Sequence, residues 1–445
     1  MVLLLRWLFT PTFRPQVKEI LNGHTPQVGL CENNHMGTPT VRQAYLDWLR
    51  IMAIIGVLVF HAAMAFVAEW EWHIKNKETS YLLLEFNFWL SRFRMPLLFF
   101  ISGAVCFFII QKKSGGQFIG LRFRRLFLPL LFGMLIVVPP QVYLERVTQG
   151  YTGNYLQFYG TLFTTGAYPA GNLSWHHLWF ILYLFVYDVV CAPLFVWTLS
   201  EKGKNWLQRL HWLSKGKNIY LLMLPSVIWR TSLTLRFPST HDFINDWCDL
   251  FYWLFFLLAG FLCITQSGLM DSLERNRRTS LALAFLTFIA INVVRWNDSE
   301  PWDTLLNWRS DGRTYAYLSL YAITAWCWVF AAIGYGKKYL NRTHRILQYA
   351  NEAVYPFYIL HQTIIVVIVF YVVQVEESIL AKYLFTTVLS LLVSMLIYHL
   401  FIRPYGVMRF LFGMKPKTKA TRKELPTEPE KAAPTIIAAE AIQIS

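Results

Sequence analysis

Residues 45–61 read YLDWLRIMAIIGVLVFH, and residues 93–103 read FRMPLLFFISG. Both stretches lie in long apolar blocks whose hydrophobic residues show no amphipathic spacing. A block of about 20 apolar residues, wound as a helix, matches the hydrocarbon core of a bilayer, which is ~30 Å thick. The two stretches therefore predict membrane-spanning helices.

The composition of the whole chain agrees with this prediction. Of its 445 residues, 55% are hydrophobic and only 15% are charged, whereas a soluble protein carries roughly a quarter charged residues. We expect an all-α, polytopic membrane protein with about ten transmembrane helices. The expected spans are 47–69, 82–111, 122–144, 177–199, 219–235, 247–268, 279–295, 313–335, 353–375 and 380–403.

The ends of the chain differ from its middle. The apolar stretch Val2–Phe9 is too short to span a membrane, and residues 10–40 are polar and rich in Pro, Gly and Asn. Met36 is a candidate start that precedes the first strong membrane pattern. Beyond Lys415 the chain is rich in Lys, Glu, Pro and Ala, a composition typical of disorder. We predict a tail over 1–40, a membrane domain over 41–410 and a disordered cytoplasmic tail over 411–445.

The formal charge of +15 does not indicate a nucleic-acid partner. The basic residues gather in short clusters between apolar blocks, rather than on one soluble face. Lys and Arg are enriched in the cytoplasmic loops of membrane proteins. The richest loops lie at 112–125, 202–217, 275–278 and 337–345. This pattern predicts that these loops and both termini are cytoplasmic.

The first span carries Arg50 and His61, eleven residues apart. Eleven residues make about three helical turns, so the two side chains share one face and are separated by roughly 16 Å of rise. Asp47 pairs with Arg50 at helical spacing. Ionisable residues in a membrane span indicate function. A hydrogen bond between helices is the alternative for His61.

Other polar residues in or near the spans also fit either a functional or a structural role. Arg94 lies in the second span, and Arg122 and Arg125 begin the third, where they fit either lipid headgroups or the phosphates of a cytoplasmic ligand. Trp179 fits an interfacial belt. His177 and His361 fit either helix packing or chemistry. The expected site residues are His61, Arg50, His177 and His361 as catalytic groups, with Asp47, Arg94, Arg122, Arg125 and Trp179 binding substrate.

Several familiar signatures are absent from the sequence. The six cysteines form no CxxC pair, and no metal-ligand spacing, phosphate loop or GxSxG motif occurs. We therefore expect no metal and no bound cofactor. Histidine is the natural general base near neutral pH. Histidines buried in a membrane tunnel, with cationic groups at its cytoplasmic mouth, suit transfer of a group from a charged donor to a hydroxyl.

Taken together, the motifs resemble the acyltransferase-3 family of membrane O-acyltransferases. They are an R-x10-H pair, an FF-ISG stretch, an R-x-x-R-L-x-x-P segment, an H-x-W pair and a Y-x-x-H pair. In the same order, these motifs lie in this chain at Arg50 and His61, Phe99 to Gly103, Arg122 to Pro129, His177 and Trp179, and Tyr358 and His361. Within the family, the chain looks most like the branch that succinylates periplasmic glucans.

The resemblance implies an enzyme of a bacterial inner membrane, with acyl-CoA as donor substrate and a glycan hydroxyl as acceptor. It implies that His61 is the general base, that Arg50 and Asp47 hold the donor, and that Arg122 and Arg125 bind the CoA phosphates. His177 and His361 would orient groups or relay protons. The lipid bilayer completes the expected partners.

Two other functions compete with acyl transfer. Intramembrane His and Arg residues also serve proton-coupled transporters or flippases of lipid-linked or acyl substrates. Such proteins usually contain internal repeats, and the two halves of this sequence show no convincing repeat. A non-catalytic scaffold has no need for Arg50 and His61 on one face. The sequence therefore favours acyl transfer.

Overall fold

The computed structural model describes residues 43–416. The expected N-terminal tail and residues 417–445 of the expected C-terminal tail lie outside this range. Within it, the regular elements are helices, and the only bridges are the isolated β-bridges Val67–Ser80 and Ala167–Leu173. The prediction of an all-α protein is confirmed.

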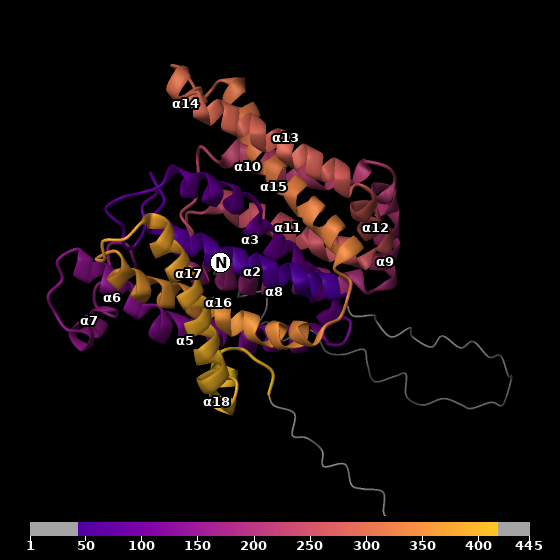
Figure 1. Cartoon of the computed structure of the whole chain (residues 1–445). Helices are drawn as coiled ribbons and strands as arrows, with labels where there is room; N and C mark the ends of the chain where they lie inside the picture. Colours follow the sequence, from indigo (N-terminus) through magenta and orange to yellow (C-terminus); the bar gives the residue numbers. More distant parts are fainter. Residues whose placement is uncertain (1–42, 417–445) are drawn as a thin grey trace, which may run out of the picture. The chain divides into compact units, whose positions relative to one another are not determined.

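The long helices follow one another along the chain, and shorter helices lie in several of the connections between them (Figure 1). They are α2 (Ala44–Met64), α3 (Tyr81–Ile110), α8 (Trp179–Thr198), α11 (Trp247–Thr265), α13 (Arg277–Trp296), α15 (Gly312–Tyr339), α16 (Arg345–Val372) and α17 (Ile379–Ile397). The shorter ones are α4 (Gly115–Arg122), α5 (Leu128–Phe132), α6 (Pro139–Thr148), α7 (Tyr155–Thr161), α9 (Glu201–Arg209), α10 (Leu224–Leu233), α12 (Ser267–Arg275), α14 (Pro301–Thr304) and α18 (Gly406–Leu411). Helices α4, α5 and α6 form one stretch joined by π-helical turns at Phe123–Phe127 and Gly133–Val137.

Among residues 43–416, nine helical stretches are long and apolar enough to cross a membrane. They agree with nine of the ten expected spans, so the chain is a multi-pass membrane protein. The exception is 219–235, which forms a 3-10 turn at Asn218–Met223 followed by the ten-residue α10. Ten residues rise about 15 Å, roughly half of a bilayer core. Pro225 lies in the first turn of α10 and breaks the continuity with the preceding turn.

Two glycines let α3 and α11 pack backbone to backbone. A Cβ on Gly103 of α3 would collide with the carbonyl of Leu257, and a Cβ on Gly260 of α11 would collide with the carbonyl of Phe100. Small residues at helix crossings are the usual way for membrane helices to approach closely. The glycine of the FFISG stretch is therefore needed for this crossing.

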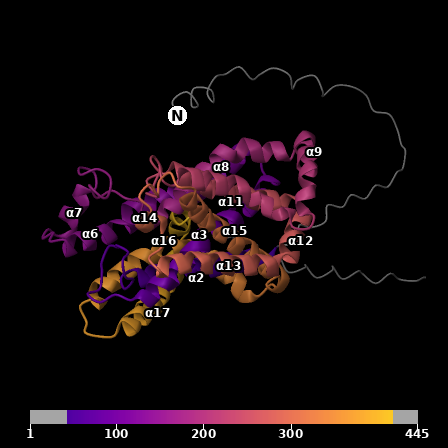
Figure 2. The ribbon, with the colours of Figure 1, turned by 90° about the horizontal axis from the view of Figure 1, so that it is seen from above.

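Helices α2, α3 and α16 lie at the centre of the contacts that build the site. Helix α2 packs on both α3 and α16, and α3 also packs on α8 and α11. Helices α13 and α15 run side by side in both views (Figures 1 and 2). The ordered chain continues past residue 410, because Phe412 is buried against Phe132, with ring centroids 5.3 Å apart.

Candidate active site

A cavity of about 350 Å³ opens between α2, α3, α10, α11, α16 and the start of α8. The connection from α10 to α11 completes its wall. Aromatic side chains from three helices, Phe60, Trp179 and Trp253, give it apolar surfaces. Its polar groups include two histidines expected from the sequence, His61 and His177. The cavity therefore combines apolar walls with titratable groups, as small-molecule sites do.

His61 on α2 and His361 on α16 form a hydrogen-bonded pair. Nδ1 of His61 lies 2.9 Å from Nε2 of His361, and Nδ1 of His361 lies 2.6 Å from the carbonyl oxygen of Tyr358. A carbonyl oxygen only accepts, so Nδ1 of neutral His361 carries the proton. Its Nε2 is then the acceptor, and Nδ1 of His61 donates to it. Nε2 of His61 consequently keeps a lone pair, the state that a general base requires.

His177 is held against the same turn of α16. Its Nε2 lies 3.0 Å from the carbonyl of Ile359. The hydroxyl of Tyr358 donates a hydrogen bond to the backbone carbonyl of His177. The His177 and His361 ring centroids are 5.1 Å apart. Nδ1 of His177 is buried and has no hydrogen-bond partner in the described part of the chain. Three histidines that the sequence singled out thus come together, although they lie on separate segments.

Trp179 and Arg94 also face this cavity. The Trp179 ring lies 4.4 Å from that of His241, centroid to centroid. The Arg94 guanidinium carbon lies 3.4 Å from the centroid of the Phe60 ring, a cation–π geometry. Nε of Arg94 is buried, and none of residues 43–416 forms a hydrogen bond with it. Arg94 therefore places a positive charge beside the histidine pair.

Sequence reasoning missed the opposite wall of the cavity. There Arg230 of α10 forms an ion pair with Asp249 of α11, and the Ser239 hydroxyl donates to the other carboxylate oxygen at 2.6 Å. The signal was present, since Arg230 interrupts the apolar stretch 219–235, but it was not counted among the expected site residues. Its partner Asp249 lies nineteen residues away.

The connection before α11 is itself anchored. Asp246 accepts a hydrogen bond from the Tyr183 hydroxyl at 2.6 Å and one from the backbone N–H of Thr240 at 3.3 Å. Burial, together with nearby Asp249, raises the pKa of Asp246 to about 6. Burial and the neighbouring Arg94 and Arg230 lower the pKa of His241, so its imidazole is neutral at neutral pH.

On α2, Arg50 lies about three turns and Asp47 about four turns from His61, and both lie outside the cavity lining. Arg50 bonds to Asp47 at 3.2 Å and to the Asn351 side-chain oxygen at 2.5 Å. Asn351 and His361 both belong to α16. The face shared by Arg50 and His61 therefore lies along α16, which explains their helical spacing.

Arg122 and Arg125 occupy different environments, and neither lines the cavity. Arg122 is buried, with Nε 2.9 Å from Asp188 of α8 and an amino group 2.9 Å from the Cys106 sulfur. Arg125 is half-buried. The guanidinium of Arg122 is thus already paired, and it ties the third span to α8.

Comparison with known proteins identifies the family. Residues 43–399 match the acyltransferase domain of the acyltransferase-3 family. The chain belongs to the acyltransferase-3 family. It is therefore a membrane acyltransferase, and the resemblance seen in its motifs is confirmed.

Within the acyltransferase-3 family, the similar curated proteins are named glucans biosynthesis protein C. Those of Salmonella heidelberg (strain SL476) and Salmonella typhi are each 22% identical to this chain over 396 residues. The alignment covers 86% of this chain and 97% of each relative. No solved structure matches the chain.

Proposed function

We propose that the protein transfers an acyl group from cytoplasmic acyl-CoA to a hydroxyl of a glycan outside a bacterial inner membrane. Both termini are cytoplasmic in this proposal, which the basic loops support. The names of the similar Salmonella proteins support a glucan as acceptor. The observation that carries the proposal is the His61–His361 hydrogen bond at the cavity.

The chemistry assigns the acceptor proton to His61. Nε2 of His61 takes the proton of the glycan hydroxyl while the hydroxyl oxygen attacks the thioester carbonyl carbon. Nδ1–H of His61 stays bonded to His361, which holds the ring in the required tautomer. Collapse of the tetrahedral intermediate breaks the C–S bond. The proton on His61 then passes to the leaving sulfur, which yields the ester and free CoA.

Arg94 supplies the charge that this step needs. The attacked carbonyl oxygen becomes negative in the tetrahedral intermediate, and a fixed cation stabilises it most when water is excluded. Arg94 lies on the cavity wall with His61, and its Nε has no hydrogen-bond partner among residues 43–416. The rings of Trp179 and Trp253 offer surfaces for stacking on a sugar.

The donor approaches along α16 from the end that carries Asn351. Arg50, held by Asp47 and Asn351, lies there with its side chain 31% exposed. A partly exposed guanidinium suits the phosphates of CoA. Of the two arginines at the start of the third span, Arg125 joins Arg50 in this role, and Arg122 positions its helix through Asp188.

The test is release of free CoA by the full-length protein in nanodiscs. Acetyl-, succinyl- and longer acyl-CoA are supplied with and without periplasmic glucan, and the glucan is examined by mass spectrometry. We expect CoA release and ester formation that require both glucan and His61. The matched variants are His61→Ala and, as control, His211→Ala, because His211 is exposed and remote from the cavity.

Two results would contradict the proposal. One is full activity of a folded His61→Ala protein. The other is no turnover with any donor by folded wild-type protein. Uptake of labelled acyl or lipid-linked substrate into proteoliposomes, under a proton gradient, would then favour the transporter.

A further inference from the structure

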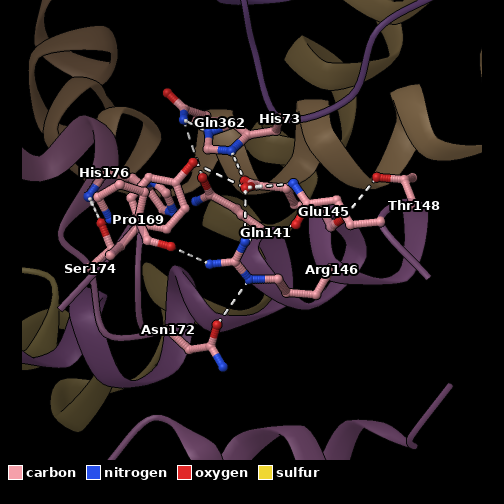
Figure 3. A network of polar contacts seen from close by, with 12 residues as sticks. His73, Gln141, Glu145, Arg146, Thr148, Pro169, Asn172, Ser174, His176 and Gln362 are labelled. Atoms are coloured by element: carbon pink, nitrogen blue, oxygen red, sulfur yellow. Dashed lines mark hydrogen bonds and ion pairs between the residues drawn. The ribbon is translucent and has the colours of Figure 1, made fainter. Parts of the chain in front are cut away.

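Three residues outside the cavity form a second buried polar cluster. His73 lies in the connection between α2 and α3, Glu145 on α6, and His176 just before α8. One ligand atom from each lies within 4.8 Å of those of the other two (Figure 3). We propose that His73, Glu145 and His176 bind a divalent transition-metal ion of the Zn²⁺ class.

The donor set fits such an ion. Two imidazoles and one carboxylate form a known zinc site that leaves a fourth position open. At bond lengths of about 2.1 Å, tetrahedral ligand atoms lie roughly 3.4 Å apart. Because the ligand atoms lie within 4.8 Å of one another, closing the longest separation takes a shift of at most about 1.4 Å, within reach of side-chain rotation. Soft thiolate ligands are absent from the cluster, which favours zinc over ions that prefer sulfur.

His176 provides the observation that points to a ligand. Its Nε2 is buried and has no hydrogen-bond partner within residues 43–416. A buried polar atom left in this state destabilises the fold by about 1–3 kcal/mol. The His176 ring lies 4.5 Å from that of His73, with the two planes nearly perpendicular. A metal ion between the two rings satisfies the unpaired nitrogen.

Glu145 supplies the negative charge. It is only 3% exposed, and one of its oxygens faces Nδ1 of His73. The other oxygen accepts from the Tyr168 hydroxyl at 3.0 Å. A carboxylate oxygen only accepts, so the Tyr168 hydroxyl is the donor of this hydrogen bond. A ligating carboxylate fixed in this way by an outer partner is usual in metal sites.

Arg146 is the cation that competes with a metal ion for Glu145. Its Nη1 lies 3.9 Å from the oxygen that Tyr168 also contacts, on the side away from His73. The guanidinium is otherwise engaged by the side chain of Asn172 and the carbonyl of Pro169 (Figure 3). It also donates to the carbonyl of Gly171. Arg146 therefore leaves the oxygen that faces His73 available.

Gln362 completes the outer contacts of His73. Its side-chain amide lies 3.1 Å from Nε2 of His73 and 3.2 Å from the Gln141 oxygen. When Nδ1 of His73 binds a metal, its Nε2 carries the proton and needs an acceptor. A half-turn of the Gln362 amide presents its oxygen for this purpose, and a matching half-turn of the Gln141 amide keeps the hydrogen bond between the two. Metal-bound histidines commonly donate to such a carbonyl.

The cluster shares its backbone with the histidines of the active site. His176 is the residue before His177, and Gln362 is the residue after His361. A metal ion would thus tie together the α2–α3 connection, α6 and the start of α8. Through Gln362 it would also fix the turn of α16 that holds both active-site histidines. We assign the metal a positioning role, which does not depend on the proposed acyl donor.

The experiment measures metal content in the full-length, tag-free protein in nanodiscs. The protein is stripped with chelator, equilibrated with ZnSO4 or CoCl2, dialysed and assayed by inductively coupled plasma mass spectrometry. We expect about one equivalent of zinc, and a visible Co²⁺ absorption band typical of low-coordinate nitrogen and oxygen ligands. His176→Asn and Glu145→Gln should each weaken binding at least ~10-fold, whereas His211→Asn should bind as wild type does.

Thermal unfolding with and without zinc gives a second measurement. Zinc should raise the midpoint of wild type and of His211→Asn, but not that of His176→Asn. Should a variant fail to fold, the wild-type zinc content and Co²⁺ spectrum still decide the matter. Wild-type protein with less than ~0.1 equivalent of zinc, or folded variants that bind as wild type does, would overturn the proposal. His73 and Glu145 would then be a hydrogen-bonded pair without metal.

Discussion

Nδ1 of His61 lies 2.9 Å from Nε2 of His361, across 300 residues of sequence. The Tyr358 carbonyl decides the direction of this hydrogen bond, because it can only accept from Nδ1 of His361. The bond orients His61 and leaves its Nε2 free to take a proton. His361 here orients the base as a carboxylate does in many histidine-based sites, and the Tyr358 carbonyl fixes the tautomer of His361.

This relationship predicts different effects for the two histidines. His61→Ala should lower kcat by about 10²–10⁴, because it removes the base. His361→Gln should have a smaller effect, since the Gln oxygen can accept from His61 and preserve part of its orientation. CoA release at saturating substrate measures both. Equal losses in the two folded variants would mean that His361 also takes part directly.

The α3–α11 crossing predicts that its glycines resist substitution. Gly103→Ala and Gly260→Ala should lower the thermal midpoint by several degrees, because each new Cβ meets a backbone carbonyl that cannot rotate away. Gly116→Ala is the matched control, since open space surrounds that position. Thermal unfolding in detergent provides the measurement, and equal midpoints for all three variants would exclude this crossing.

The Arg122–Asp188 ion pair predicts that removing one partner destabilises the fold more than removing both. Arg122→Leu leaves the Asp188 carboxylate buried without its counter-charge, which should destabilise the fold by about 3–5 kcal/mol. The double variant Arg122→Leu, Asp188→Leu should regain most of this stability. Arg124→Leu serves as control, because Arg124 is exposed.

The measurement for this pair is the thermal midpoint of each variant, taken together with the apparent affinity for acyl-CoA. If Arg122→Leu weakened donor binding and left the midpoint unchanged, Arg122 would be assigned to the CoA phosphates after all.

The raised pKa of Asp246 predicts a pH effect on stability. In the folded protein this carboxyl holds its proton up to about pH 6, whereas an unfolded Asp loses it near 3.8. Its contribution is therefore fully present below pH 3.8 and is lost as pH rises through 6. Thermal midpoints between pH 4 and 7 should fall less steeply for Asp246→Asn than for wild type. Parallel curves for the two proteins would contradict this assignment.

The number of spans shows how much of the fold can be predicted from local sequence. Nine expected spans were found because the length and hydropathy of a block are local properties. The segment 219–235 failed this rule. Its Pro225 and Arg230 suit a short helix that packs against α11 and α15 and pairs with Asp249, and neither contact can be read from the segment alone. The expected orientation and cytoplasmic termini stay predictions.

Part of the candidate site could be predicted from the sequence. The spacing of Arg50 and His61 correctly indicated one helical face, and both side chains bond to α16. The same reasoning grouped Arg122 with Arg125, because both are basic and close in sequence. In the structure the two differ in burial, because Arg122 is buried and forms an ion pair with Asp188 on another helix.

By itself, the sequence determined a multi-pass helical protein of the acyltransferase-3 family, with histidines inside its spans. Hydropathy and helical period are set within a window of one helix, so they need no tertiary information. The tertiary structure alone decided which histidines meet, which arginines are paired, and that His73, Glu145 and His176 converge. These contacts join distant segments, and only the packing of helices against one another selects them.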